Sequence, residues 1–237
     1  MLVSTIGLCK IYSAGEAIVR AVSEVTFSIE RGEFVAISGR SGSGKSTLMN
    51  LLGLLERPDR GRYFLRGRDV ADLSEDARAA IRNKEIGFVF QLPALLPRAS
   101  ALENVELPLI YARVSKSERR RKAGEALERV GLGERMHHWP HQLSGGQQQR
   151  VTIARAIVND PALVLADEPT GSLDSITGNE ILSLFEILRQ SGCTIVIVTH
   201  ASDVAERAER QIALHDGQIF VDRPKANKPA FSNVCQP

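Results

Sequence analysis

The sequence has few aromatic residues, few cysteines and almost no net charge. Aromatic side chains make up 5% of the 237 residues, and the three cysteines, Cys9, Cys193 and Cys235, lie far apart without any CxxC pair. A small, odd number of dispersed cysteines excludes a disulfide-stapled scaffold and indicates a reducing, cytosolic compartment. The 30 basic and 28 acidic residues give a formal net charge of +2, so the composition does not indicate a large basic surface for binding nucleic acid.

Long apolar runs are also missing. No run approaches the roughly 20 residues that a membrane-spanning helix needs, and residues 1–10 lack the basic-then-apolar pattern of a signal peptide. We therefore expect that the chain does not cross a membrane by itself. The composition, 43% hydrophobic and 24% charged in 25.9 kDa, is that of a globular protein with a sizeable core, either as one domain or as a core with a smaller lobe.

Strand and helix patterns alternate along much of the chain. Residues 17–22 and 23–29 are rich in β-branched side chains and predict two strands of a small antiparallel sheet. Further on, short apolar runs alternate with helical segments, which predicts βαβ units and a mostly parallel sheet. The predicted buried strands are residues 33–38, 86–90, 162–166 and 194–199, and the predicted helices include residues 45–55 and 177–190.

The segment between residues 92 and 158 has a different character. It is rich in charged, Leu- and Ala-bearing stretches, and residues 117–130 predict an amphipathic helix. We expect Pro93, Pro97, Pro108 and Pro140 to separate its helices. These patterns predict one domain over residues 1–222, with a core formed by residues 1–91 and 159–222, a helical subdomain formed by residues 92–158, and a flexible tail at residues 223–237.

One glycine-rich segment, residues 39–46, reads GRSGSGKS and fits the pattern GxxxxGK[ST]. It follows a predicted strand and opens a predicted helix, which is the context of a phosphate-binding loop. The glycines allow backbone N–H groups to surround a β-phosphate, while Lys45 would reach the β- and γ-phosphates and Ser46 would ligate Mg²⁺. The alternative is a Gly/Ser-rich turn with a solvated lysine, which the flanking elements disfavour. The segment predicts that the chain binds a nucleoside triphosphate.

An apolar strand ends in two acidic residues further along the chain. Residues 163–168 read LVLADE, so Asp167 and Glu168 are expected at the carboxyl edge of the sheet, where ligands bind in open α/β folds. Asp167 would hold Mg²⁺, mainly through its water shell, and Glu168 would face an attacking water. The alternative is a strand that ends in a polar turn before Pro169. The phosphate-binding loop in the same chain favours the catalytic interpretation.

A third motif, LSGGQ at residues 143–147, opens another predicted helix. Ser144, Gly145 and Gly146 would present free N–H groups and a hydroxyl at the helix start, which forms a second anion site. One nucleotide is not easily held by both sites of one chain, whereas a two-fold, head-to-tail pairing brings Ser144 of one copy to the γ-phosphate held by Lys45 of the other. The alternative is an ordinary serine N-cap followed by flexible glycines.

With these motifs the sequence resembles the ATP-binding-cassette (ABC) ATPases over residues 12–221. Gln91, at the end of a predicted strand, resembles the Q-loop glutamine of that family, residues 172–174 (SLD) resemble its D-loop, and His200 resembles its switch histidine. Tyr12 corresponds to the aromatic residue on which adenine stacks. The resemblance implies an α/β fold with a P-loop NTPase (RecA-like) core, an N-terminal antiparallel β subdomain and an inserted α-helical subdomain.

The same resemblance implies transport-coupled ATP hydrolysis with ATP and Mg²⁺. The implied catalytic residues are Lys45, Gln91, Glu168 and His200, and the implied Mg²⁺ ligands are Ser46, Gln91 and Asp167. The implied nucleotide contacts, counted over both copies of a dimer, are Tyr12, Gly39, Arg40, Ser41, Gly42, Ser43, Gly44, Lys45, Ser46, Thr47, Ser144, Gly145, Gly146, Gln147 and Asp174.

Within the family, the sequence is most similar to the lipoprotein-release and macrolide-efflux ATPases, although bacitracin-resistance and haem-export ATPases share much of the pattern. The similar stretches are FVFQ at residues 88–91, LLP at 95–97, ALENV at 101–105, LPL at 107–109 and ADEPTGSLD at 166–174. The sequence departs from these relatives at RAS, residues 98–100, and at LERPDR, residues 55–60. Both departures lie near the expected groove for a membrane partner, so they bear on the choice of cargo and not on the ATPase chemistry.

The resemblance implies an ATPase homodimer, peripheral on the cytoplasmic face of the inner membrane, that drives permease subunits on separate chains. The groove beside residues 92–105 would receive a cytoplasmic permease helix. The main alternative is a soluble ABC ATPase that acts on nucleic acid or ribosomes, and it is disfavoured because the chain has one cassette and no sustained heptads between Lys45 and Ser144. A non-hydrolysing interaction module is disfavoured because Lys45, Ser144, Asp167 and Glu168 are all intact.

Overall fold

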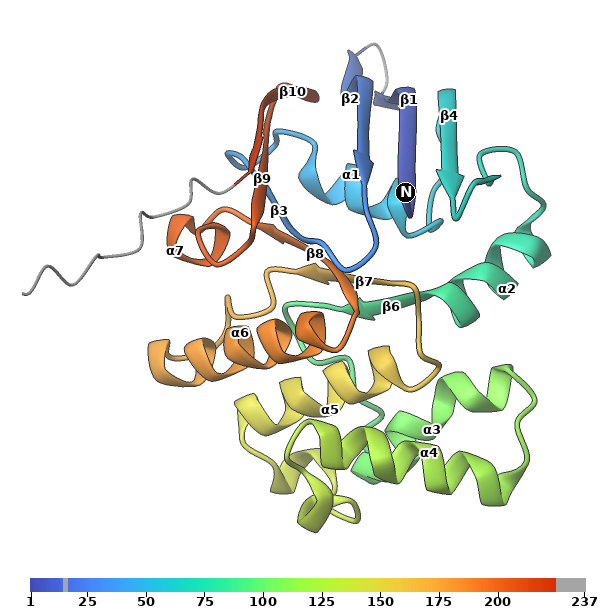
Figure 1. Ribbon diagram of the computed structural model, residues 1–237, viewed down its shortest axis with the longest axis vertical. Helices are drawn as coiled ribbons and strands as arrows, with labels where there is room; N and C mark the ends of the chain where they lie inside the picture. Colours follow the sequence, from blue (N-terminus) through green and yellow to red (C-terminus); the bar gives the residue numbers. More distant parts are fainter. Residues whose placement is uncertain (15–16, 225–237) are drawn as a thin grey trace, which may run out of the picture.

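The computed structural model describes residues 1–14 and 17–224, and it arranges them around two β-sheets (Figure 1). The first sheet is antiparallel, in the order β2-β1-β4-β5, and the second has six strands in the order β10-β9-β3-β8-β7-β6. In the second sheet, β9, β3, β8, β7 and β6 are parallel, and β10 pairs antiparallel with β9 at one edge. The architecture confirms the predicted α/β class with a separate antiparallel sheet.

The antiparallel sheet consists of β1 (Val3–Ala14), β2 (Ala17–Ile29), β4 (Arg60–Leu65) and the short β5 (Arg68–Asp69). The prediction of two strands at residues 17–22 and 23–29 is wrong, because β2 is one continuous strand paired with β1. The pairing shifts register at several points, and Glu24 takes a left-handed conformation with φ of 53°. Such bulges bend a strand without ending it, and strand propensity alone does not reveal them.

The six-stranded sheet separates two hydrophobic layers. Alternate residues of β3 face opposite sides: Val35 and Ile37 pack with α1 and the antiparallel sheet, whereas Phe34 and Ala36 pack with the helices below (Figure 1). This two-sided burial explains the continuous apolar runs of its strands. The strands are β3 (Phe34–Ser38), β6 (Ile86–Val89), β7 (Leu163–Asp167), β8 (Thr194–Thr199), β9 (Arg210–His215) and β10 (Gln218–Pro224).

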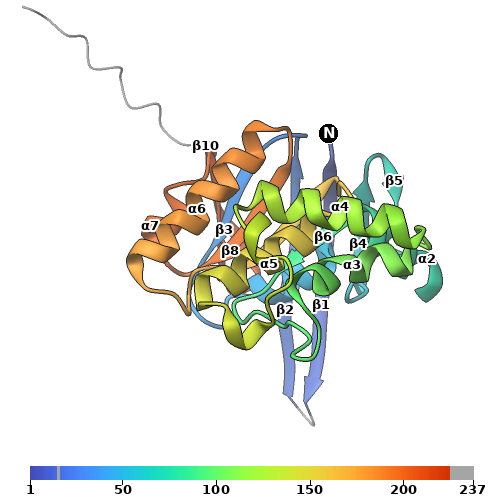
Figure 2. The same ribbon diagram turned by 90° about the horizontal axis from the view of Figure 1, so that it is seen from below.

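The helical insert lies on the side of this sheet that faces away from the antiparallel sheet, as the view from below shows (Figure 2). Its helices are α3 (Ala101–Tyr111), α4 (Lys116–Arg129) and α5 (Gly145–Ile157), and the remaining helices are α1 (Lys45–Leu52), α2 (Glu75–Glu85), α6 (Ser175–Gln190) and α7 (Ser202–Ala205). Short 3₁₀ turns at Gly133–Arg135 and Pro140–Gln142 connect α4 to α5.

Pro108 does not separate two helices, contrary to the prediction, because it lies inside α3. A proline within a helix removes one backbone hydrogen bond and clashes with the preceding turn. Here the helix start offsets that cost, since Ser100 and Glu103 form a reciprocal capping box. Asn83 also donates to the Pro108 carbonyl at 2.9 Å, which ties this part of α3 to the end of α2.

The helix predicted over residues 45–55 ends earlier, at Leu52. Leu54 has a left-handed backbone with φ of 55°, and two guanidinium groups of α2 bind its carbonyl: Arg78 at 2.6 Å and Arg82 at 2.8 Å. The helix end is therefore fixed by a contact with a distant helix. At the other end of the chain, Arg223 and Pro224 belong to β10 and not to a tail, since they pair with β9. Residues 225–237, including Cys235, lie outside the described residues.

Over residues 1–14 and 17–224, no helix combines the length and the apolar content that crossing a bilayer requires.

A candidate nucleotide site at the ends of the parallel strands

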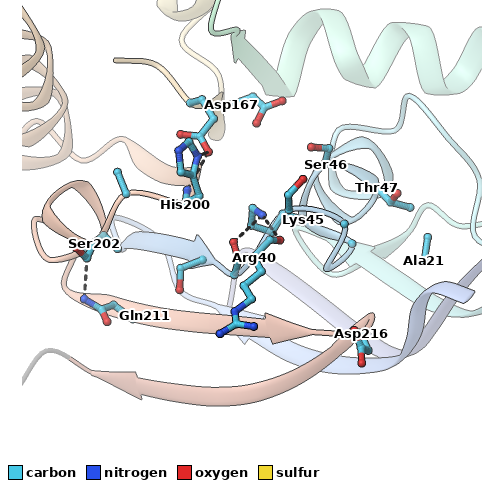
Figure 3. Close-up of a pocket in the computed structure, with 18 of the residues that line it drawn as sticks. Ala21, Arg40, Lys45, Ser46, Thr47, Asp167, His200, Ser202, Gln211 and Asp216 are labelled. Carbon is cyan, nitrogen blue, oxygen red and sulfur yellow. Dashed lines mark hydrogen bonds and ion pairs between the residues drawn. The ribbon is translucent and has the colours of Figure 1, made fainter. Parts of the chain in front are cut away.

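The functional residues predicted in the core gather where β3, β7 and β8 end. These strands are parallel neighbours, so the loop after β3, the acids after β7 and the histidine after β8 meet at one edge of the sheet. They surround an open cavity of about 1170 Å³ (Figure 3). Its lining includes the predicted residues Gly39, Arg40, Ser41, Gly42, Gly44, Lys45, Ser46, Thr47, Asp167, Glu168 and His200.

The phosphate-binding loop is held tightly against the antiparallel sheet. Gly44 has φ of 96°, and a Cβ at this position would lie 2.0 Å from the carbonyl oxygen of Ala21, so only glycine fits. Lys45 is buried, and its ammonium donates to the carbonyls of Gly39 and Arg40, each at 2.8 Å. Ser43 is the one residue of the loop that is buried and does not line the cavity. The carbonyls of the loop therefore bind the ammonium of its own lysine, close to where phosphate would bind.

Two carboxylates and a hydroxyl form a cluster suited to a divalent cation. Burial raises the pKa of Asp167, the neighbouring Glu168 carboxylate raises it further, and Lys45 opposes both effects. The Asp167 carboxylate and the Ser46 hydroxyl face the same part of the cavity (Figure 3). Carboxylate and hydroxyl oxygens are the donors that Mg²⁺ prefers. The residues present thus fit the ion.

Glu168 is held by the end of β8. Its carboxylate accepts hydrogen bonds from the Thr199 hydroxyl at 3.0 Å and from the His200 backbone N–H at 2.8 Å, and the His200 ring nitrogen Nδ1 lies 2.5 Å from it. The Glu168 backbone is left-handed, with φ of 43°. Non-glycine residues in this conformation cluster at functional sites, where surrounding contacts maintain the strain. Thr199 was not identified from the sequence, because a buried strand-end threonine carries no motif.

The signature segment does not line this cavity. Ser144 is the N-cap of α5, and it forms a capping box in which its hydroxyl accepts from the Gln147 N–H and its own N–H donates to the Gln147 side chain. Asp174 caps α6 in a similar way through Ile176 and Thr177, and the Thr177 N–H and hydroxyl lower the pKa of Asp174. Within one chain, neither Ser144–Gln147 nor Asp174 reaches the nucleotide cavity.

The signature glycines have a packing role within the chain. A Cβ on Gly146 would lie 2.3 Å from the Cγ2 methyl of Thr177, and one on Gly145 would lie 3.5 Å from a methyl of Leu173. The start of α5 therefore packs directly on the D-loop and the start of α6. This contact links two motifs that are about thirty residues apart in the sequence.

Substituting Gly146 with alanine is expected to lower the free energy of unfolding by about 1–3 kcal/mol, because the new methyl overlaps Thr177. Thr177→Ser removes the clashing methyl and keeps the hydroxyl that binds Asp174. Denaturant unfolding of both single variants and the double variant measures the coupling. The double variant should recover most of the loss, and equal losses in Gly146→Ala and the double variant would contradict the packing explanation.

Two predicted residues lie beside the cavity without lining it. The Tyr12 hydroxyl donates to Glu56, and it also lies near the hydroxyl of Thr47, which does line the cavity. Burial raises the pKa of Tyr12, and Glu56 raises it further. The Gln91 side chain lies against the D-loop, since a Cβ on Gly171 would be 2.9 Å from its amide nitrogen. Both roles, adenine stacking and Mg²⁺ ligation, remain predictions.

The structure adds cavity residues that no motif indicated. Val19, Arg20 and Ala21 of β2 form one wall, because the antiparallel sheet folds over the phosphate-binding loop. The other additional lining residues come from β3, α7 and its flanks, and the β9–β10 hairpin: Ser38, Ala201, Ser202, Ala205, Glu206, Gln211, Asp216 and Arg223. No sequence signal identifies them, since they reach the site only through the tertiary arrangement.

Comparisons with known proteins find relatives over most of the chain. A family model described as ABC transporter matches residues 22–171. The macrolide export ATP-binding/permease protein MacB of Hyphomonas neptunium is 56% identical over 219 residues, which cover 92% of this chain and 34% of that protein. An uncharacterized ABC transporter ATP-binding protein of Thermotoga maritima is 54% identical over 210 residues, which cover 89% of this chain and 90% of that protein. The chain thus spans about a third of the length of the MacB relative.

Solved structures share the whole fold. The ATP-binding cassette MJ0796, in a dimeric post-hydrolysis state bound to ADP and Pi, has a TM-score of 0.86 at 45% identity, covering 94% of this chain and 98% of that chain. CbiO1 from Clostridium perfringens, part of the ABC transporter complex cbiONQ, has a TM-score of 0.85 at 30% identity, covering 94% of this chain and 88% of that chain. These similarities confirm the predicted core, antiparallel subdomain and helical insert.

Proposed function

The chain belongs to the ABC transporter family as an ATPase domain, and from this premise we propose that two copies close head-to-tail around two ATP molecules to drive a membrane permease. The observation that carries the proposal is that the two segments predicted to bind phosphate, the glycine-rich loop and the start of α5, are separate within the chain. Lys45 and its loop line the cavity, whereas Ser144 at the start of α5 lies outside it. A site that needs both is complete only when a second copy supplies Ser144. The dimeric state of the MJ0796 cassette supports this arrangement.

In the proposed reaction, ATP binding draws the Lys45 ammonium from the loop carbonyls to the β- and γ-phosphates, so that one set of acceptors replaces another. Bound Mg²⁺, held by Ser46, Asp167 and Gln91, would supply neutralisation of the charge on the β- and γ-phosphate oxygens. Glu168 orients or deprotonates the attacking water, and His200 contacts the γ-phosphate. Loss of that phosphate removes the link between Lys45 and the partner copy's signature serine, and the dimer opens.

We assign to the segment after β6 the role of passing the closing and opening of the dimer on to a permease. Gln91 begins that segment, and the neighbouring Leu92 and Leu96 expose 71% and 48% of their surface. Exposed apolar side chains beside the helical insert are suited to contact a partner helix. We infer that a cytoplasmic helix of a permease docks beside residues 92–105, and that the ATPase therefore lies on the cytoplasmic face of the inner membrane.

The direction we propose is export or lipoprotein release. The support is the sequence pattern of residues 101–109 and 166–174, together with the identity to proteins named for macrolide export. Action on nucleic acid or ribosomes is not favoured, because the basic run at residues 119–122 is compensated by acidic side chains. Arg121, for example, pairs with Glu118 at 2.5 Å and with Glu125 at 2.6 Å.

The proposal is tested by recovering tagged Glu168→Gln protein from native membranes in mild detergent with MgATP and identifying what accompanies it. We expect a permease with few spanning helices and a large extracytoplasmic domain. A permease with many helices and no such domain would contradict the export or lipoprotein-release assignment. Recovery of ribosomes or DNA without a membrane protein would contradict the transporter role.

Trp139 provides an optical test of closure, because it is the single tryptophan of the chain and lies 45% exposed in the loop before Ser144. We expect MgATP to change its emission in the Glu168→Gln protein, since head-to-tail closure covers the signature loop. The Lys45→Ala variant, which should not retain the nucleotide, serves as the control. Unchanged emission at an ATP concentration that saturates a separate binding assay would contradict closure over this loop.

A further inference from the structure

A single glutamine of the signature helix contacts two catalytic loops at once. Gln149 is 1% exposed, and its amide nitrogen Nε2 donates to the carbonyl of Phe90 at 3.0 Å and to the carbonyl of Pro169 at 2.9 Å. Phe90 immediately precedes Gln91, and Pro169 immediately follows Glu168. One buried amide thus joins the backbones on either side of the γ-phosphate site.

The orientation of this amide follows from its partners. Both are carbonyl oxygens, which can only accept hydrogen bonds, so the donor nitrogen Nε2 of the amide must face them. The amide oxygen Oε1 is consequently turned into the interior, where none of the described residues donates to it. A buried acceptor without a donor is unfavourable. The glutamine bears this cost while its Nε2 supplies a donor to both carbonyls.

Gln149 and Ser144 belong to the same helix, α5, counting its N-cap. Ser144 caps α5 and Gln149 lies five residues later, which corresponds to about 7.5 Å along the helix axis. The two loops that Gln149 binds, one after Phe90 and one after Glu168, also contact one another, since the Ser172 hydroxyl donates to the Gln91 carbonyl at 3.1 Å. Side-chain hydrogen bonds thus connect α5 to both loops and the two loops to each other.

We propose that Gln149 is a positioning residue for ATP hydrolysis: it fixes the backbones beside Gln91 and Glu168 to the signature helix, so that docking of Ser144 on the partner's nucleotide sets both groups in place. This proposal rests on the proposed ATPase function and deepens it. It assigns no contact between Gln149 and the nucleotide. A substitution should therefore reduce the rate of the chemical step and leave nucleotide affinity nearly intact.

The test compares Gln149→Met, which keeps the side-chain length but removes both donors, with Asn159→Leu as a matched control. Asn159 follows α5 and donates its amide to the Asn83 carbonyl at 2.8 Å, away from both catalytic loops. We expect Gln149→Met to lower kcat by about tenfold or more, with the Kd for ATP within about threefold of wild type. Asn159→Leu should lower the Tm by a similar amount and keep the wild-type kcat per ATP-binding site.

Gln149→Asn provides a second variant if the methionine protein does not fold. Its amide is one methylene shorter and reaches at most one of the two carbonyls, so an intermediate kcat is expected. If wild type hydrolyses ATP and both Gln149 variants match Asn159→Leu in kcat, the positioning role is wrong while the proposed function stands. If kcat falls only in proportion to the folded fraction while KM stays unchanged, Gln149 is structural only. Absence of turnover in wild type, with its permease present, would contradict the proposed function itself.

Discussion

Replacing Glu168 with glutamine is expected to lower ATP turnover at saturating MgATP by about 100-fold or more, while ATP binding persists. The substitution keeps the size of the side chain and one acceptor oxygen for the His200 N–H, while the Thr199 hydroxyl can turn to accept from the new amide NH2, so the local fold should survive. It removes the negative charge that would orient or deprotonate the water. Hydrolysis would then stall with the nucleotide trapped, and the protein should elute as a stable dimer in MgATP.

The measurement is phosphate release together with size-exclusion chromatography in the presence of MgATP. Glu206→Gln is the matched control, since Glu206 lines the same cavity near α7 and loses the same charge without any proposed role. Its turnover should stay within about twofold of wild type. Turnover near wild type in Glu168→Gln would contradict the assignment of Glu168 as the catalytic base. Loss of the dimer with loss of activity would instead indicate a defect in nucleotide binding.

Ser144→Arg is expected to abolish hydrolysis even though Ser144 is outside the cavity of its own chain. The bulky cation would replace the hydroxyl that the partner's γ-phosphate needs at the start of α5. Lys45→Ala should be equally inactive, for loss of its own phosphate contact. Mixed together, the two inactive proteins should regain activity. Half of the random dimers then contain one intact site, which predicts about a quarter of the wild-type rate if the two sites act independently.

The mixing experiment uses equal amounts of the two variants and measures phosphate release against each variant alone. The recovery arises because the Lys45 of one chain and the Ser144 of the other form a complete site. Full activity in Ser144→Arg alone would show that one chain suffices, and it would remove the head-to-tail dimer from the mechanism. Ile187→Val, at an exposed position of α6 that does not line the cavity, controls for the effects of purification and mixing.

The sequence could predict the place of the glycine-rich loop between β3 and α1, because the pattern that indicates it is local. Residues 39–46 form the loop and the following helix start within one short segment, and glycine is required there by backbone geometry, as at Gly44. Asp167, Glu168 and His200 could be placed as well, since each follows an apolar strand and parallel strands end at the same edge. These inferences need no knowledge of distant contacts.

Other features could not be predicted, because they depend on residues far apart in the chain. The end of α1 is set by Arg78 and Arg82, which bind the Leu54 carbonyl from α2. The strand boundary expected near residue 22 disappears because pairing with β1 carries β2 across Glu24. Propensity describes only the local chain, and in both places a tertiary contact overrides it.

The sequence by itself determined the fold class and the ABC ATPase family, and it predicted the positions of Asp167 and Glu168 at the strand end, because spacing and strand-to-loop context are properties of short segments. Only the tertiary structure decided what surrounds those groups: the wall formed by Val19–Ala21, the hydrogen bond from Thr199 to Glu168, and the two hydrogen bonds that Gln149 donates. The hydrogen bonds among them join residues separated by 20 to 59 positions, and a single sequence holds no record of which distant side chains fold together. The same reasoning places Ser144 outside its own cavity, which makes the second copy part of the proposed site.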